Sequence, residues 1–227
     1  MCFSDLAAVA HLQLGLDAFS PREISEKVEG VGVTKARLPF LQTAMLGVLA
    51  GAFIGLGALF YTLVASDATL GFAATRVLGG FVFSLGLILV SVGGAELFTG
   101  NNLMVMAWAD GRITVAELLR NWAIVYVANA AGAIGLAAVV WLANHGAMNG
   151  GAVAATYVKI AAAKSALPFG EAFFKGVLCN LLVCLAVWMA MAGHTVVDKI
   201  VAIVLDRKST PSELQSHHDL VCRLLLE

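Results

Sequence analysis

The sequence predicts an all-α integral membrane protein. Hydrophobic residues make up 60% of its 227 positions and charged residues 13%, and the mean hydropathy is +0.88. Such a composition is far from that of a soluble domain of this length. Four uncharged runs are each long enough to cross a bilayer as a helix: Phe40 to Ala65, Val77 to Ala95, Asn121 to Asn144 and Gly176 to Val197. A polar interruption from Glu96 to Asn102 follows the second run, so a broken membrane helix is expected there.

Residues 1–38 are predicted to form a cytoplasmic segment ahead of the first span. Ser20 followed by Pro21 is typical of a helix start, since serine caps the end and proline favours the first helical position. We expect a short amphipathic helix from there to about Glu29, lying on the cytoplasmic face of the membrane. The alternative is a solvated helix that contacts nothing. The transmembrane domain is expected to cover 39–205.

Glycines recur in the spans at the spacing that close helix packing requires. Gly47, Gly51 and Gly55 are four residues apart in the first span, and Gly132 and Gly135 lie in the third. These positions favour helix contacts within one subunit, with contacts between subunits as the alternative.

The second span cannot be a single straight helix. The otherwise uncharged stretch from Val77 to Ala109 would form a helix of roughly 50 Å, against a hydrocarbon core of about 30 Å. The part after Asn102 is too short for a second crossing. Irregular backbone at membrane depth is tolerated only inside protein or along a water-filled path, which indicates conduction or transport. Glu96 is predicted to hold this loop in place by accepting backbone N–H bonds, the alternative being direct contact with substrate.

Cationic side chains near the span ends predict the orientation. The flanks expected in the cytoplasm carry Lys35, Arg37, Arg112, Arg120, Lys199, Arg207 and Lys208, and the opposite side carries Arg76, Lys159, Lys164 and Lys175. Lys164 stands where cations should be rare, so it is either an anion attractor or a lysine in contact with headgroups. A net charge of −1 without a basic stripe excludes nucleic acid as a partner. The four cysteines have no metal-binding spacing, and no cofactor is expected.

Two blocks of sequence closely resemble the formate/nitrite transporter family. The first runs from Gly94 to Asn101 (GAELFTGN) and the second from Lys175 to Met189, and the resemblance covers roughly Ser20 to Leu205. It implies an aquaporin-like bundle with an internal inverted repeat of six spans, two of them broken, assembled as a homo-pentamer with one pore in each subunit. It also implies transport of small monovalent anions, such as formate or nitrite, with involvement of protons, in the lipids of the cytoplasmic (inner) membrane.

The resemblance also implies which residues lie along the substrate pathway. Leu87 and Leu97 are expected near the constrictions, and Lys164 in the outer vestibule, where a lysine attracts anions. The other expected pathway residues are Phe83, Phe98, Thr99 and Asn180. The chemistry of Thr99 suits this role independently, because its hydroxyl can hydrogen-bond to an ion in an otherwise apolar passage.

The C-terminal residues depart from the family pattern. The resemblance predicts that the chain continues after Leu205 to a second break containing a histidine and then to a sixth span. Residues 206–227 instead form a polar tail with Pro211, and His217 has neighbours unlike those of the family histidine. We therefore expect a bundle that is incomplete at the C-terminus, truncated after the start of the fifth span.

Three hypotheses about function remain open. The first is a channel or transporter for small monovalent anions, and the second is a non-conducting truncated membrane subunit that retains part of the fold. The third is a membrane-embedded enzyme using Glu96, which we disfavour because the sequence shows no nucleophile and base pair and no metal-spaced set.

Overall fold

The computed structural model describes residues 19–209, with side chains up to Leu205. The regular elements in this part are all helical, and four are long and apolar enough to cross a membrane: α3 (Phe40–Ala65), α4 (Phe72–Gly93), α7 (Val115–Leu142) and α9 (Phe169–Ala192). The remaining helices are α2 (Pro21–Ala36), α5 (Phe98–Asn101), α6 (Met104–Ala109), α8 (Ala152–Ser165) and α10 (Val196–Ser209), with two short 3-10 turns, η1 (His145–Ala147) and η2 (Asn149–Gly151). The predicted all-α membrane architecture is confirmed.

Three of the four spans begin earlier than their uncharged runs. The first two turns of α4, α7 and α9 contain charged residues, so each of these helices starts before its uncharged run. Thr114 caps α7 through a reciprocal pair of hydrogen bonds with Glu117, so this acidic residue starts the helix. A charge near the end of a long helix can reach the interface, and it therefore does not mark the end of a span.

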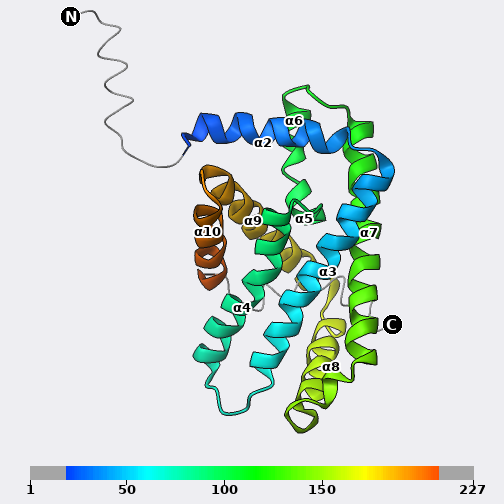
Figure 1. Cartoon of the computed structure of the whole chain (residues 1–227), viewed down its shortest axis with the longest axis vertical. Coiled ribbons are helices and arrows are strands. Elements are labelled where there is room, and N and C mark those ends of the chain that lie inside the picture. Colours follow the sequence, from blue (N-terminus) through cyan, green and yellow to red (C-terminus); the bar gives the residue numbers. More distant parts are fainter. Residues whose placement is uncertain (1–18, 210–227) are drawn as a thin grey trace, which may run out of the picture.

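Helix α2 lies across one end of the bundle (Figure 1). The predicted start is confirmed, because Ser20 and Glu23 form a capping box. The helix continues to Ala36, beyond the expected end near Glu29. A buried stripe with one residue per turn, made of Ile24, Val28, Gly32 and Ala36, faces the protein. The alternative of a helix without contacts was therefore wrong.

Helices α3 and α7 pack so closely that only glycine fits at their contact. A Cβ atom added to Gly51 would overlap the carbonyl oxygen of Asn129, and one added to Gly132 would overlap that of Val48. The expected contact within one subunit is confirmed for these glycines. Gly135 differs, since a Cβ there would meet no atom within 4 Å.

Two groups of buried side chains stabilise the two ends of the break in the second span. One lies where α3, α4, α9 and α10 meet, and it includes Phe83, Leu87 and Leu97. The other lies under α2 and joins it to α6 and α7 through Ala36, Met104, Ala107, Ile113 and Leu118. The first group includes Ala95 and Leu97 of the break itself, and the second includes Met104 and Ala107 of α6, which follows it.

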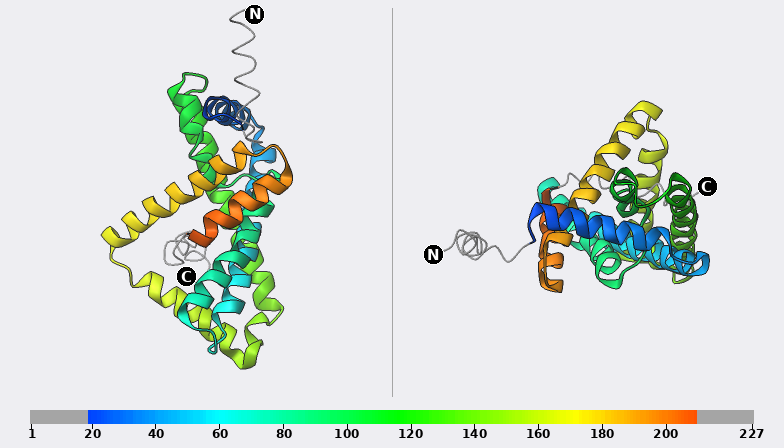
Figure 2. Two further views of the ribbon diagram at one scale, coloured as in Figure 1. Left: turned by 90° about the vertical axis from the view of Figure 1, so that its left-hand side faces the viewer. Right: turned by 90° about the horizontal axis from the view of Figure 1, so that it is seen from above.

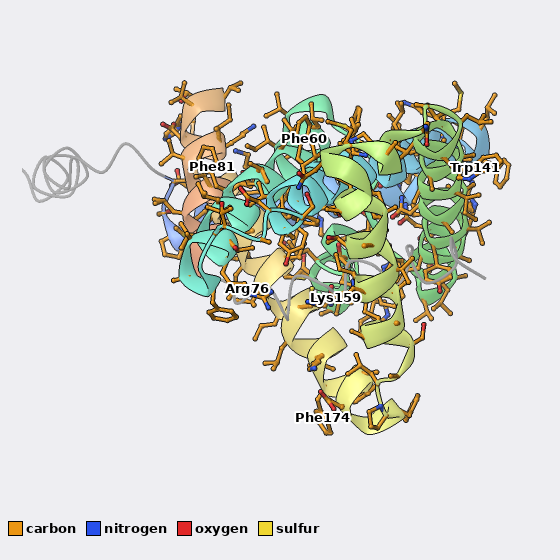
Figure 3. All side chains as sticks on the ribbon, turned by 90° about the horizontal axis from the view of Figure 1, so that it is seen from below. Phe60, Arg76, Phe81, Trp141, Lys159 and Phe174 are labelled. Carbon is orange, nitrogen blue, oxygen red and sulfur yellow. The ribbon has the colours of Figure 1, made fainter. Side chains whose placement is uncertain are left out.

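Helices α8 and α9 meet at a corner that stands away from α3, α4 and α7 (Figure 2). Only Cys179, Val183, Ala186 and Ala190 of α9 are buried. Large apolar side chains cover the outside of the molecule, and Figure 3 shows Trp141 and Phe174 there, with 77% and 67% of their surfaces exposed. An apolar exterior of this kind suits contact with lipid or with other membrane-spanning subunits.

Candidate functional site at the helix break

The break is shorter than the sequence predicted. Helix α4 ends at Gly93, and Gly94 adopts a left-handed conformation with φ of 69°, which glycine tolerates without strain. The chain is irregular only to Leu97, which has an extended backbone, and the helical turn α5 begins at Phe98. The prediction of an irregular segment from Glu96 to Asn102 was therefore wrong for Phe98–Asn101, because these residues are helical.

Glu96 is held by side chains, whereas the sequence suggested backbone N–H donors. Its carboxylate is buried and lies 3.2 Å from the ammonium nitrogen of Lys35 on α2. The side-chain amide of Asn101 donates a second hydrogen bond to it at 2.7 Å. Lys35 also donates to Asn101 Oδ1 at 2.8 Å. These contacts join α2 to the break, and they support the predicted role of Glu96 in holding the loop.

Asn129 is the buried polar residue that contacts both sides of the break, and the sequence analysis did not identify it. Its Nδ2 donates to the carbonyl oxygens of Gly47 and Glu96, both at 2.8 Å. Its Oδ1 accepts from the N–H of Phe98 at 2.9 Å. One amide thus satisfies backbone groups that the interrupted helix leaves without intrahelical partners. An asparagine inside an uncharged span was the signal that could have identified it.

Two further residues of α7 complete this network. Asn121, also buried, accepts from Asn101 Nδ2 at 2.9 Å and donates to the carbonyl oxygen of Lys35 at 3.2 Å. The indole N–H of Trp122 donates to the carbonyl oxygen of Asn101 at 3.1 Å. The break is therefore fixed by α2, α3 and α7 together, which are remote from it in sequence.

A cavity of about 200 Å³ lies beside the break. Leu87 and Leu97, the two residues expected at constrictions, both line it, and both are buried. The other lining residues come from α2, α4, the break, α5, α6, α9 and α10, and from the turn between α5 and α6: Val28, Val31, Gly32, Lys35, Val90, Ser91, Gly94, Ala95, Gly100, Asn101, Leu103, Met104, Val187, Ala190, Met191 and Lys199. Its wall is mostly apolar, with two lysines.

Thr99 presents an unusual hydroxyl group. The oxygen is buried and has no hydrogen-bond partner among the described residues, although its backbone carbonyl accepts from the thiol of Cys184 at 3.5 Å. A buried hydroxyl without a partner costs free energy, so such groups in folded proteins usually serve a ligand or an ordered water. Thr99 therefore lies where α5 contacts α9, and it is not among the residues that line the cavity.

The four remaining expected pathway residues each occupy a different environment. Asn180 is half-buried on α9 and accepts from Asn102 at 2.9 Å. Phe98 is directed towards α7, where its ring lies 5.4 Å from that of Tyr126, and it does not line the cavity. Phe83 is buried in the same group as Leu87 and Leu97. Lys164 lies in the last turn of α8, and it is not among the residues that line the cavity.

Comparisons with known proteins agree with this architecture. Residues 22–206 match the family model of the formate/nitrite transporters. The chain is 39% identical over 190 residues to the formate channel FocA of Haemophilus influenzae, covering 83% of this chain and 66% of the relative. The same identity and length hold for the formate channel FocA of Escherichia coli K12, with 83% and 67% covered. The chain thus spans about two thirds of the length of these curated relatives.

Two solved structures share the fold. A pentameric formate channel with formate bound has a TM-score of 0.72 and 33% sequence identity, with 80% of this chain and 74% of that chain covered. An ion channel of the FNT family has a TM-score of 0.72 at 24% identity, with 86% and 81% covered.

Proposed function

The chain belongs to the formate/nitrite transporter family, and we propose that it conducts small monovalent anions, such as formate or nitrite, across the cytoplasmic membrane. It is a multi-pass membrane protein of a family of transporters, not enzymes. The observation that carries the proposal is the buried hydroxyl of Thr99, two positions after Leu97 at a break inside a membrane helix, which has no hydrogen-bond partner among the described residues. An apolar passage with one free hydrogen-bond donor suits a small anion that sheds its water.

The proposed pathway passes Leu87 and Leu97, with Phe83, Phe98 and Asn180 contributing further along it. Transfer of an unpaired ion through apolar side chains is heavily penalised, and neutralisation by a proton would remove most of that penalty. We therefore propose protons as the second species that the pathway handles. The Thr99 hydroxyl would donate to the anion or to its neutral acid.

Lys164 is proposed to attract anions at the outer end. It is half-buried in the last turn of α8 and does not line the cavity. Lys175 provides a matched control, because it forms an ion pair with Glu171 on its own helix. Lys164→Ala is expected to lower uptake most at low anion concentration, since a local charge enriches the anion there, and Lys175→Ala is expected to do less. Equal loss from both substitutions would contradict a specific role for Lys164.

We propose that the chain assembles as a homo-pentamer in the membrane. The support is the pentameric formate channel that it resembles at 33% identity, together with the largely apolar exterior. In this arrangement 1–38 lie in the cytoplasm and 39–205 form the membrane domain in contact with lipid, while 207–227 fall outside the family match. Native mass spectrometry of the purified protein measures the assembly state, and a monomer alone would contradict this part of the proposal.

Uptake of ¹³C-formate and of nitrite into liposomes that contain the purified 227-residue chain tests the function directly. Saturable flux above that of empty liposomes is expected. Leu97→Ala should widen the passage and admit larger anions such as lactate, and an unchanged size limit would remove Leu97 from the constriction. If the folded wild-type chain gives no flux, the alternative of a non-conducting subunit replaces the channel proposal.

A further inference from the structure

Lys199 is an uncompensated positive charge in the wall of the cavity. It is half-buried in the first turn of α10, and the two charged residues that line the cavity are Lys199 and Lys35. Lys35 is neutralised by Glu96, 3.2 Å away. Within residues 19–205, Lys199 has no carboxylate within ion-pair distance. The cavity therefore carries one net positive charge.

The neighbouring acidic residue does not offset this charge. Asp198 accepts hydrogen bonds from the backbone N–H groups of His194 and Thr195, at 3.1 and 2.8 Å. These bonds hold its carboxylate at the start of α10. Consecutive residues of a helix point about 100° apart, so Asp198 and Lys199 face different directions.

Lys27 adds a second cation nearby. Its ammonium group donates to the carbonyl oxygen of Met191 at 3.2 Å and lies 4.3 Å from the ring centre of Phe19. Partial burial lowers the pKa of Lys27, and the positive charge of Lys199 lowers it further. Two like charges repel each other, and an anion between the two ammonium groups would relieve this repulsion.

We propose that Lys199 is the direct contact of an anion-binding site in this cavity, at the end of the pathway where α2 lies. The ligand is a small monovalent carboxylate or oxyanion of the size of formate. Lys27, the neighbour in sequence of the lining residue Val28, adds positive potential, and Ser91 in the wall carries a hydroxyl that can offer a hydrogen bond. A volume of 200 Å³ holds such an ion with part of its hydration shell, because a water molecule occupies about 30 Å³.

This site rests on the proposed function but does not include Lys164, which is not among the residues that line the cavity. The cationic flanks place the α2 end in the cytoplasm. An anion would thus meet a lysine on each side of the apolar passage, Lys164 outside and Lys199 inside. The cost of leaving bulk water would be reduced before the constriction from either direction.

Binding of ¹³C-formate to the purified 227-residue chain in nanodiscs, followed by NMR line broadening, tests the site without requiring transport. Lys199→Met keeps the length of the side chain and removes its charge, and it should weaken binding at least about fivefold, as loss of one contact charge in a partly exposed site would. Lys199→Arg should stay within about threefold of wild type. Lys159→Met removes the same charge from an exposed position on α8, away from the cavity, and should change binding less than twofold.

Equal weakening by Lys199→Met and Lys159→Met would show a net-charge effect and overturn the proposal, as would formate binding that is unchanged in Lys199→Met. Thermal unfolding of each variant checks folding, and Lys199→Gln replaces Lys199→Met if the latter does not fold. Formate binding that depends on Lys199, without anion flux, would contradict the channel proposal and would still support this binding site. Anion flux together with formate binding that does not depend on Lys199 would support the channel proposal and contradict this site.

Discussion

Replacing Asn129 by alanine tests whether one amide fixes the break in the second span. The substitution removes two donated hydrogen bonds and one accepted bond, and it leaves the N–H of Phe98 and the carbonyl of Glu96 without this partner. The close approach of Gly51 involves the backbone oxygen of Asn129, so the packing of α3 against α7 is retained. The change therefore acts on hydrogen bonds and leaves the helix contact intact.

The expected loss of stability is about 2 to 6 kcal/mol. The lower limit assumes three lost hydrogen bonds at about 0.6 kcal/mol each, which is the average for hydrogen bonds between membrane helices. The upper limit assumes two buried backbone groups left unsatisfied, at about 3 kcal/mol each. Asn102→Ala is the matched control, because Asn102 makes a single side-chain bond, to Asn180. We expect that control to lose about 1 kcal/mol.

Unfolding in mixed micelles with increasing SDS, followed by the fluorescence of the four tryptophans, measures both variants. Asn129→Asp adds a second comparison. It keeps the size of the side chain but places a carboxylate oxygen against two carbonyl oxygens, so it should be no more stable than Asn129→Ala near neutral pH. The reasoning is refuted if Asn129→Ala loses no more stability than Asn102→Ala.

Three further predictions concern the same region. Gly51→Ala should destabilise the protein by about 1 to 3 kcal/mol through overlap with the backbone of α7, whereas Gly135→Ala, which meets open space, should be neutral or slightly stabilising in the same unfolding assay. Glu96→Gln should cost about 1 to 3 kcal/mol because it leaves Lys35 without its carboxylate, and adding Lys35→Met should recover part of that loss; a purely additive double variant would argue against coupling. Thr99→Val should leave the unfolding midpoint unchanged or raise it, since the hydroxyl has no described partner, while formate uptake falls; unchanged uptake would separate Thr99 from the pathway.

The sequence was sufficient to predict the helices and the existence of the break. The four spans follow from the length and apolar character of their runs, and the start of α2 from the pattern of Ser20, Pro21 and Glu23. The break follows from Glu96 and the following polar residues inside an apolar stretch that is too long for one crossing. These features depend on local composition, which a single sequence displays.

The partners of the break could not be predicted in the same way. Lys35 is 61 positions from Glu96 in sequence, and it was interpreted as an orientation signal, whereas its ammonium group contacts the carboxylate. Asn129 was part of an uncharged run and received no role. Both contacts depend on how α2 and α7 pack against the break, and spacing along the chain gives no information about that packing.

The contact of Asn129 with the break has a consequence for the order of events during synthesis. Asn129 follows Glu96 by 33 positions, so at about 5 to 20 residues per second it leaves the ribosome roughly 2 to 7 s later. During that interval the carbonyl of Glu96 and the N–H of Phe98 lack the side-chain amide of Asn129, to which they are hydrogen-bonded in the folded protein. The second crossing therefore reaches its final shape only after the third helix has arrived, and insertion of this membrane protein cannot proceed as a simple succession of finished helices.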